Sequence, residues 1–130
     1  MKLQKTLLAA LLAALILSAG CASKETILSK ADNGKQVSIH PGEELVVTLA
    51  SNPTTGYTWE ASNLDAAVLQ QIGDAKFTSD NTARVGSGGS LTLVFKALEP
   101  GATSLVLVYH RPWEANVAPL DTFKVTVTVK

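Results

Sequence analysis

The stretch DTFKVTVTVK, residues 121 to 130, decides the class of fold because its apolar and polar residues alternate without a break. In an extended chain, one face carries all four large apolar residues of the stretch: Phe123, Val125, Val127 and Val129. Threonines and lysines occupy most of the other face. This pattern is typical of a strand with one buried and one exposed face.

Three further stretches predict strands by the same reasoning. Residues 45–49 are mostly apolar, residues 91–97 alternate, and residues 105–109 are apolar on both faces, as in a central strand. Residues 64–72 are ambiguous and also fit a short helix. Turn-forming triplets separate the stretches, namely Asp32-Asn33-Gly34, His40-Pro41-Gly42 and Glu99-Pro100-Gly101. We therefore predict an all-β fold, an immunoglobulin-like β-sandwich of about seven to eight short strands.

The first twenty residues have the composition of an export signal. Lys2 and Lys5 precede an entirely apolar run over residues 7–17, and small residues follow it. The run is short for a membrane span, and this order of charged, apolar and small segments is typical of a cleaved signal peptide. We assign residues 1–20 to a lipoprotein-type signal peptide, 21–25 to a lipidated cysteine with a short tether, and 26–130 to one domain.

Cys21 is the only cysteine, so an internal disulfide is impossible. Residues 17–21, Leu-Ser-Ala-Gly-Cys, resemble a lipobox, although Ser18 stands where leucine is commoner. Acyl chains such as palmitate on Cys21 would hold the protein to a membrane without a transmembrane helix. Since Ala22 follows where aspartate would favour the inner membrane, we expect a bacterial cell-envelope location at the outer membrane, facing the periplasm or exterior. An ordinary secretory signal with an incidental cysteine is the alternative.

The charge balance argues against a nucleic-acid partner. The chain has eleven basic and eleven acidic residues, and removal of the signal peptide, with Lys2 and Lys5, leaves a net charge of −2. Binding to nucleic acid needs a basic face, which this composition does not supply. We expect the domain to act as a monomer.

Three unusual segments are predicted to share one end of the sandwich. Because the Glu99-Pro100-Gly101 turn joins residues 90–98 to 102–110, we expect these two strands to pair antiparallel. That pairing would place residues 86–89 beside residues 111–113. The strand over residues 44–50 leads into the third segment, NPTTGY, at the same end, provided that residues 64–83 make one net return across the molecule.

Each segment also has an ordinary structural interpretation. Asn-Pro and Thr-Gly pairs form plain turns, a Gly-Ser-Gly-Gly run is a common flexible linker, and Trp113 would fit the core near a strand end. These interpretations weaken when taken together. Ordinary connections give no reason for a rigid proline turn, a bare-backbone loop and an Arg-Pro-Trp segment to meet at one edge.

At these segments the sequence resembles the chagasin-type inhibitors of papain-like cysteine peptidases. The resemblance rests on three motifs in the family's order, with Trp59, Phe95, Gly101, Tyr109 and Glu114 between and after them, and it covers nearly all of residues 26–130. Tyr57 stands where phenylalanine is also common. The motif residues are Asn52, Pro53, Thr54, Thr55, Gly56 and Tyr57, then Gly86, Ser87, Gly88 and Gly89, and finally Arg111, Pro112 and Trp113.

The resemblance implies a reversible, tight-binding inhibitor that occludes the active-site cleft of a papain-like cysteine peptidase with three loops. It implies that Thr54 and Thr55 lie near the catalytic cysteine and histidine of the peptidase. Residues 86–89 would run along the non-primed subsites, where chains without β-carbons approach the main chain closely. On the primed side, Trp113 would stack on indole groups, with Pro112 stiffening its approach and Arg111 orienting the loop or meeting an acidic rim.

The residues themselves give little support for catalysis. His40 and His110 lie in different segments with no serine or cysteine motif nearby, and adjacent Glu43 and Glu44 would point to opposite faces of a strand. No metal-ligand or phosphate-binding motif occurs, so we expect no enzyme, metal or cofactor. One alternative is a lipid-anchored envelope module for binding or adhesion. Another is an inhibitor of a different peptidase class, which the small threonine tip disfavours.

Overall fold

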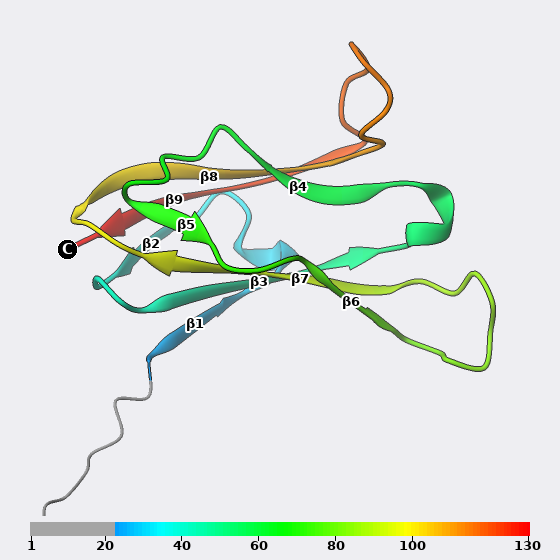
Figure 1. The fold of residues 1–130 in the computed structure, drawn as a ribbon, viewed down its shortest axis with the longest axis horizontal. Helices are drawn as coiled ribbons and strands as arrows, with labels where there is room; N and C mark the ends of the chain where they lie inside the picture. The colour runs from blue at the N-terminus through cyan, green and yellow to red at the C-terminus, as the bar shows by residue number, and fades with distance from the viewer. Residues whose placement is uncertain (1–22) are drawn as a thin grey trace, which may run out of the picture.

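The structure, a computed structural model, describes residues 23–130 as a two-layer β-sandwich (Figure 1). The predicted signal peptide and Cys21 lie outside the described residues. Two short 3-10 turns, Lys30–Asp32 and Pro53–Thr55, lie between consecutive strands. The nine strands within residues 23–130 are β1 Glu25–Leu28, β2 Gln36–Ile39, β3 Glu44–Ser51, β4 Thr58–Ser62, β5 Leu69–Gln71, β6 Lys76–Ser79, β7 Gly89–Ala97, β8 Gly101–His110 and β9 Asp121–Val129.

The strands form two sheets, which we name sheet A and sheet B. Sheet A has the order β1-β3-β7, with β5 and β6 both paired to the far side of β7, and sheet B has the order β2-β9-β8-β4. Most pairs are antiparallel, but β1 pairs in parallel with β3 and β2 pairs in parallel with β9. Since β1 and β2 are consecutive yet lie in different sheets, the chain crosses the edge of the sandwich between them.

The core lies between the sheets and consists of the inward faces that the alternation predicts. Every second residue is buried throughout β3 and β7 and over the central parts of β8 and β9, and Phe95 and Phe123 are the largest fully buried side chains. Trp59 of β4 closes the core at one end. The immunoglobulin-like β-sandwich predicted from the sequence is therefore confirmed.

The predicted pairing of residues 90–98 with 102–110 is wrong. These residues form β7 and β8, which lie in different sheets, and the turn between them crosses from sheet A to sheet B. Backbone bonds from the amides of Leu98 and Glu99 to carbonyls at Val68 and Ala67 hold the crossing. Because β7 and β8 still run in opposite directions, the start of β7 and the end of β8 lie at the same end of the sandwich.

Residues 64–72 do not form a helix. The side chain of Asp65 accepts the amide of Ala67 in a turn, and Leu69–Gln71 then pairs with β7 as strand β5. Strand β6 follows in the same direction, so β5 and β6 act as one interrupted strand returning from β4. The single net return that the sequence argument required is present.

Three connections meet at one end of the sandwich, which we name the loop end (right side of Figure 1). They are the central loop, residues 52–57, the glycine loop, residues 80–88, and the anchor loop, residues 111–120. The turns at Pro100 and Gly42 lie at the opposite end. Within residues 23–130, no helix has the length and apolar character needed to cross a membrane.

Candidate functional site

The central loop is a compact turn held by its own side chains. Asn52 begins it: its side-chain oxygen accepts the amide of Thr54 at 3.2 Å and the hydroxyl of Thr54 at 2.6 Å. The hydroxyl of Thr55 donates to the carbonyl of Asn52 at 2.6 Å. Pro53 sets the first turn of the 3-10 segment, and Gly56 ends it with a φ of 81°, which glycine adopts without strain. The tip is therefore pre-formed and carries only small side chains.

The central loop is bonded to the glycine loop. The side-chain amide of Asn52 donates to the carbonyl of Gly86 at 3.3 Å, and the preceding residue, Ser51, pairs with Gly89 in sheet A. A β-carbon on Gly89 would lie 2.0 Å from the carbonyl oxygen of Thr78, so this position requires glycine for the close approach of β6. Gly89 thus has a structural role in addition to the binding role predicted for it.

The glycine loop is closed at its base and open at its tip. The hydroxyl of Ser87 donates to the carbonyl of Asn81 at 2.9 Å, and the amide of Asp80 donates to the carbonyl of Gly88 at 3.1 Å. Gly86 has a φ of 82° and free space where a β-carbon would stand. The side chain of Val85 beside it is fully exposed. The loop therefore presents bare backbone and one apolar side chain.

Arg111 ties the central loop to the anchor loop. Its Nε donates to the carbonyl of Thr55 at 3.0 Å, its guanidinium lies 4.5 Å from the ring centroid of Tyr57, and its Nη1 contacts Glu114 at 3.1 Å. These contacts occupy the guanidinium within the protein. Of the two roles that the sequence left open for Arg111, the geometry supports orienting the loop.

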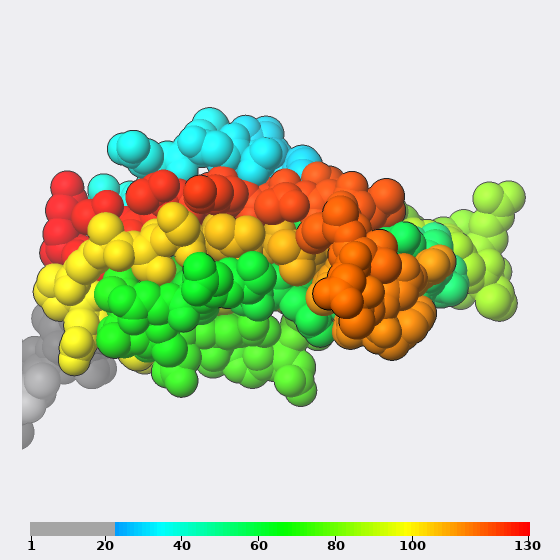
Figure 2. Space-filling model, turned by 90° about the horizontal axis from the view of Figure 1, so that it is seen from above, coloured from blue at the N-terminus to red at the C-terminus, as the bar shows by residue number. Residues whose placement is uncertain are grey.

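Trp113 is exposed and lies against the central loop. About 70% of its surface is accessible, so it is not a core residue near a strand end. A β-carbon built on Gly56 would lie 2.3 Å from the end of the indole ring of Trp113. The ring therefore packs directly against the backbone of Gly56. Figure 2 shows the anchor loop (orange) standing out at this end of the molecule. Gly56 is thus required both for its positive φ and for the seat of Trp113.

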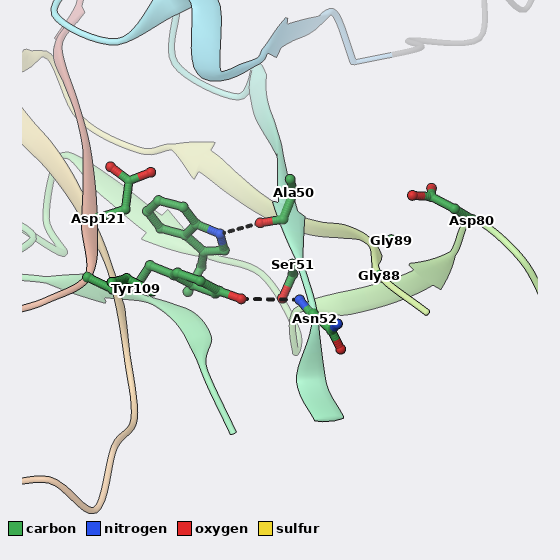
Figure 3. A pocket seen from close by; sticks show the side chains of 10 residues that line it. Ala50, Ser51, Asn52, Asp80, Gly88, Gly89, Tyr109 and Asp121 are labelled. Carbon is green, nitrogen blue, oxygen red and sulfur yellow. Dashed lines mark hydrogen bonds between the residues drawn. The ribbon is translucent and has the colours of Figure 1, made fainter. Parts of the chain in front are cut away.

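An aromatic stack supports the central loop from inside. Trp59 and Tyr109 are cross-strand partners whose rings stack at 5.0 Å, and Tyr57 packs against Tyr109 at 5.3 Å. The indole Nε1 of Trp59 donates to the carbonyl of Ala50 at 2.9 Å, and the amide of Asn52 donates to the hydroxyl of Tyr109 at 3.2 Å (Figure 3). Both bonds cross from sheet B to the end of β3, so they hold the base of the central loop.

A hollow of about 520 Å³ lies between the sheets beside this stack. At this end of sheet A the last pair is Ser51 with Gly89, so one small side chain and a bare backbone line the hollow together with the large rings of Trp59 and Tyr109. Figure 3 shows Tyr109 on one side of the hollow and Gly88 and Gly89 on the other. The hollow therefore undercuts the junction of the central and glycine loops.

The carboxyl groups whose pKa is lowered in the folded protein lie away from the three loop tips. Lys30 donates to Asp121 at 2.7 Å and holds the pKa of that carboxyl below its ordinary value. The backbone amide of Ser29 lowers the pKa of Asp32, and that of His40 lowers the pKa of Glu43. Among residues 23–130, no group of three or more His, Cys, Asp or Glu side chains could hold a metal ion.

The thirteen residues that the sequence predicted as the site all lie at the loop end, with the central loop bonded to both neighbours. Sequence reasoning named Trp59 and Tyr109 only within the resemblance and missed their role as supports of the central loop. It also missed the exposed side chains of Val85, Val117 and Leu120. Cross-strand pairing of β4 with β8 would have revealed the aromatic support, but alternation does not identify strand partners. Exposure within an irregular loop has no periodic signal.

Comparison with known proteins gives a consistent result. The family model described as chagasin family peptidase inhibitor I42 matches residues 38–127. Amoebiasin-1 from Entamoeba histolytica is 30% identical over 105 residues, which cover 79% of this chain and 98% of amoebiasin-1. The match to the family model includes every strand from β3 to β8 and all three loops.

Two solved structures have the same fold. The crystal structure of the cysteine protease inhibitor EhICP2 from Entamoeba histolytica superposes with a TM-score of 0.73 at 22% identity, covering 84% of this chain and 98% of EhICP2. PbICP-C, solved in complex with falcipain-2, gives a TM-score of 0.54 at 19% identity, covering 83% and 100% of the two chains. At these identities the likeness concerns the fold.

Proposed function

The chain belongs to the chagasin family of peptidase inhibitors and is therefore an inhibitor, not an enzyme; on this premise we propose that it reversibly occludes the active-site cleft of papain-like cysteine peptidases with its three loops. The printed descriptions of EhICP2 as a cysteine protease inhibitor and of PbICP-C in complex with falcipain-2 support this class of target. The inhibition requires no chemistry, since a filled cleft excludes substrate.

The observation that carries the proposal is the connection of the central loop to both of its neighbours. Asn52 bonds Gly86 on one side, and Arg111 bonds Thr55 on the other. Three segments distant in sequence therefore form one contact surface before any partner arrives. Such preorganisation reduces the ordering entropy lost on binding, which favours tight association through an interface of standard size, about 1,600 Å².

The central loop would enter the cleft. Its tip, Thr54 and Thr55, is narrow, and both hydroxyl protons are already directed to Asn52 within the loop. A tip of this kind has no large side chain to collide with the catalytic residues and needs little rearrangement on docking. Backbone bonds of Thr55 and Gly56 to Asn52 and Pro53 also hold the peptide in a turn. A turn is a poor substrate conformation, which explains how a peptidase inhibitor resists cleavage.

The two outer loops would act on either side of the tip. The glycine loop offers backbone groups near Gly86 and Gly88 for strand-like pairing with the peptidase main chain. Trp113 offers an exposed indole, a residue type that often dominates interface energy. Arg111, occupied within the protein, would act by positioning Trp113 and Thr55 relative to one another.

We further propose that Cys21 is lipidated and that the protein is held at the bacterial outer membrane. The described chain enters sheet A at β1, where Glu25 pairs with Glu44, and this is the end of the sandwich opposite the loop end. An attachment before β1 would leave the three loops free. Replacement of Cys21 by serine should move the full-length protein from the detergent phase to the aqueous phase, and unchanged partition would reject lipidation.

Titration of active papain with the lipid-free fragment of residues 22–130 tests the inhibitory function. Residues 23–130 contain both sheets and their complete core, so this fragment retains the elements of the fold. We expect stoichiometric, reversible loss of peptidase activity while the fragment stays intact on a denaturing gel. Full peptidase activity at micromolar fragment, or steady cleavage of the fragment, would reject the proposal for this enzyme.

A further inference from the structure

The anchor loop exposes more apolar surface than Trp113 alone. Val117 and Leu120 are 57% and 65% exposed, and with Trp113 they make three exposed large apolar side chains within ten residues. Single exposed apolar residues are common on proteins, but a local concentration of them marks an interaction site more often than chance. The concentration therefore needs an explanation beyond that given for Trp113.

One of the three residues contacts the central loop, and each of the other two lines a cavity that a residue of the central loop also lines. The ring of Trp113 lies on Gly56, Val117 lines a small cavity together with Tyr57, and Leu120 lines the hollow together with Asn52. The anchor loop thus passes around the central loop. A partner that covers the central loop and the anchor loop together would reach all three side chains.

The anchor loop is held in a defined shape. The amide of Leu120 donates to the carbonyl of Tyr109 at 2.8 Å, and the amide of Glu114 donates to the carbonyl of Arg111 at 3.0 Å. Glu114 is the only charged residue over residues 112–120, and its carboxylate is paired with Arg111. Apart from Asn116, the other exposed side chains of this segment are apolar, and its one charge is paired, which lowers the cost of covering it.

We propose that Val117 and Leu120 are additional contact residues that extend the Trp113 anchor into a wider apolar surface, which seats against an apolar area of the peptidase beside its cleft. This inference rests on the proposed inhibitory function and adds a determinant of target choice. Peptidases that share the catalytic machinery but differ in surface beside the cleft would be distinguished by it.

The test compares three forms of residues 22–130 in the papain titration: the parent, the double variant Val117→Ser/Leu120→Ser, and Ile27→Ser. Ile27 is 69% exposed, close to the value for Leu120, but lies on β1 beside Val46, away from the three loops. We expect the double variant to lose affinity about tenfold, chiefly through faster dissociation. Ile27→Ser should inhibit like the parent, and all three should unfold at similar temperatures.

A fourth form, Val117→Met/Leu120→Met, tests whether affinity depends on apolar surface at these two positions or on the exact shape of the side chains. Methionine preserves apolar surface but changes side-chain shape, so it should restore most of the affinity that serine removes. Parent-like affinity of the serine variant, or equal loss in the methionine variant, would overturn the inference. If the serine variant binds like the parent while Trp113→Ala binds weakly, only the extended contact fails. If the parent itself does not inhibit, the proposed function and this inference fail together.

Discussion

The two tryptophans lie on opposite sides of the same central loop and have opposite environments. Trp59 is 4% exposed, stacks on Tyr109 and donates its indole hydrogen to the carbonyl of Ala50, just before the loop. Trp113 is 70% exposed and lies on Gly56, near the end of the loop. One supports the loop from the core, whereas the other is presented beside it to solvent.

The two tryptophans differ in exposure because one lies in a strand, where alternation fixes the direction of the side chain, and the other lies in a loop. Trp59 lies within β4, where alternation and pairing with Tyr109 direct it inward. Trp113 comes three residues after the end of β8, following Pro112, and no ladder directs its side chain. The same residue type is therefore buried as a support at one position and exposed at the other, where we propose that it serves recognition. Each prediction below tests this division.

The largest effect is expected for Trp59→Ala. Removal of a buried indole should lower the free energy of unfolding by about 3–5 kcal/mol, because it leaves a cavity and an unpaired carbonyl at Ala50. Urea unfolding monitored by circular dichroism measures it. A loss below about 1 kcal/mol would mean that Trp59 is not a structural support.

Trp113→Ala should instead reduce the binding free energy of the inhibitor for the peptidase by about 2–4 kcal/mol, because an exposed indole at an interface contributes binding energy. Unfolding in urea should be nearly unchanged, since 70% of the side chain already faces solvent. The inhibition constant of residues 22–130 with papain is the measurement. A large loss of stability with unchanged inhibition would reverse the roles of the two tryptophans.

Tyr109→Phe tests the link between the core and the central loop, with a smaller expected effect. The ring remains stacked, but the amide of Asn52 loses its acceptor, and we expect a loss of about 1 kcal/mol in both stability and inhibition. The inhibition constant and the exchange rate of the Asn52 amide hydrogen are the readouts.

Thr103→Val is the matched control for Tyr109→Phe. Thr103 also lies on β8, and its hydroxyl accepts the amide of Asp65 at the opposite end of the sandwich. Its removal should lower stability by a similar amount, about 1 kcal/mol, without affecting inhibition. Equal weakening of inhibition by both variants would show that Tyr109 acts through general stability only.

The smallest effect on stability is expected for Asp121, which is linked to Trp59 through Lys30. Lys30 bonds this carboxylate and lies 5.5 Å from the centroid of the Trp59 ring. Because the folded state lowers the pKa of Asp121, its stabilising contribution is present at neutral pH and is lost as pH falls below the ordinary carboxyl range. The pair is well exposed and screened by solvent, so we expect Asp121→Asn to cost about 0.5 kcal/mol at pH 7.

Unfolding of the parent and Asp121→Asn in urea, measured from pH 7 down to pH 2.5, checks this dependence. The difference in the free energy of unfolding should shrink as the pH falls, because protonation of Asp121 removes its charge. A difference that grows on acidification would contradict the sign of the pKa change.

Alternation in the sequence was sufficient to predict the main strands. Residues 121–130 and 44–50 became β9 and β3 with shifts of one residue at most, because a half-buried strand must repeat its apolar residues every second position. The convergence of the three motifs also followed from strand direction. Direction survives even when the partner is misjudged, which is why the loops met although β7 and β8 do not pair.

Strand partners and loop exposure were beyond sequence reasoning for physical reasons. The faces of residues 90–98 were apparent, but a short turn such as Glu99-Pro100-Gly101 connects strands within one sheet or across two equally well. Strands β1 and β2 are four residues long and pair in parallel at sheet edges, so their alternation is too brief to be distinctive. Exposure at Val117 and Leu120 depends on tertiary packing alone.

The parallel pairing of β2 with β9 has a consequence for how the molecule is made. Gln36 lies opposite Thr126, and β9 also separates β2 from β8, so sheet B is incomplete until residues 121–129 have joined it. Strand β9 must therefore be in place before the rings of Trp59 and Tyr109 gain their final enclosure. Contacts this remote along the chain slow the search for the native state, so folding should be slow compared with that of a helical bundle of equal length.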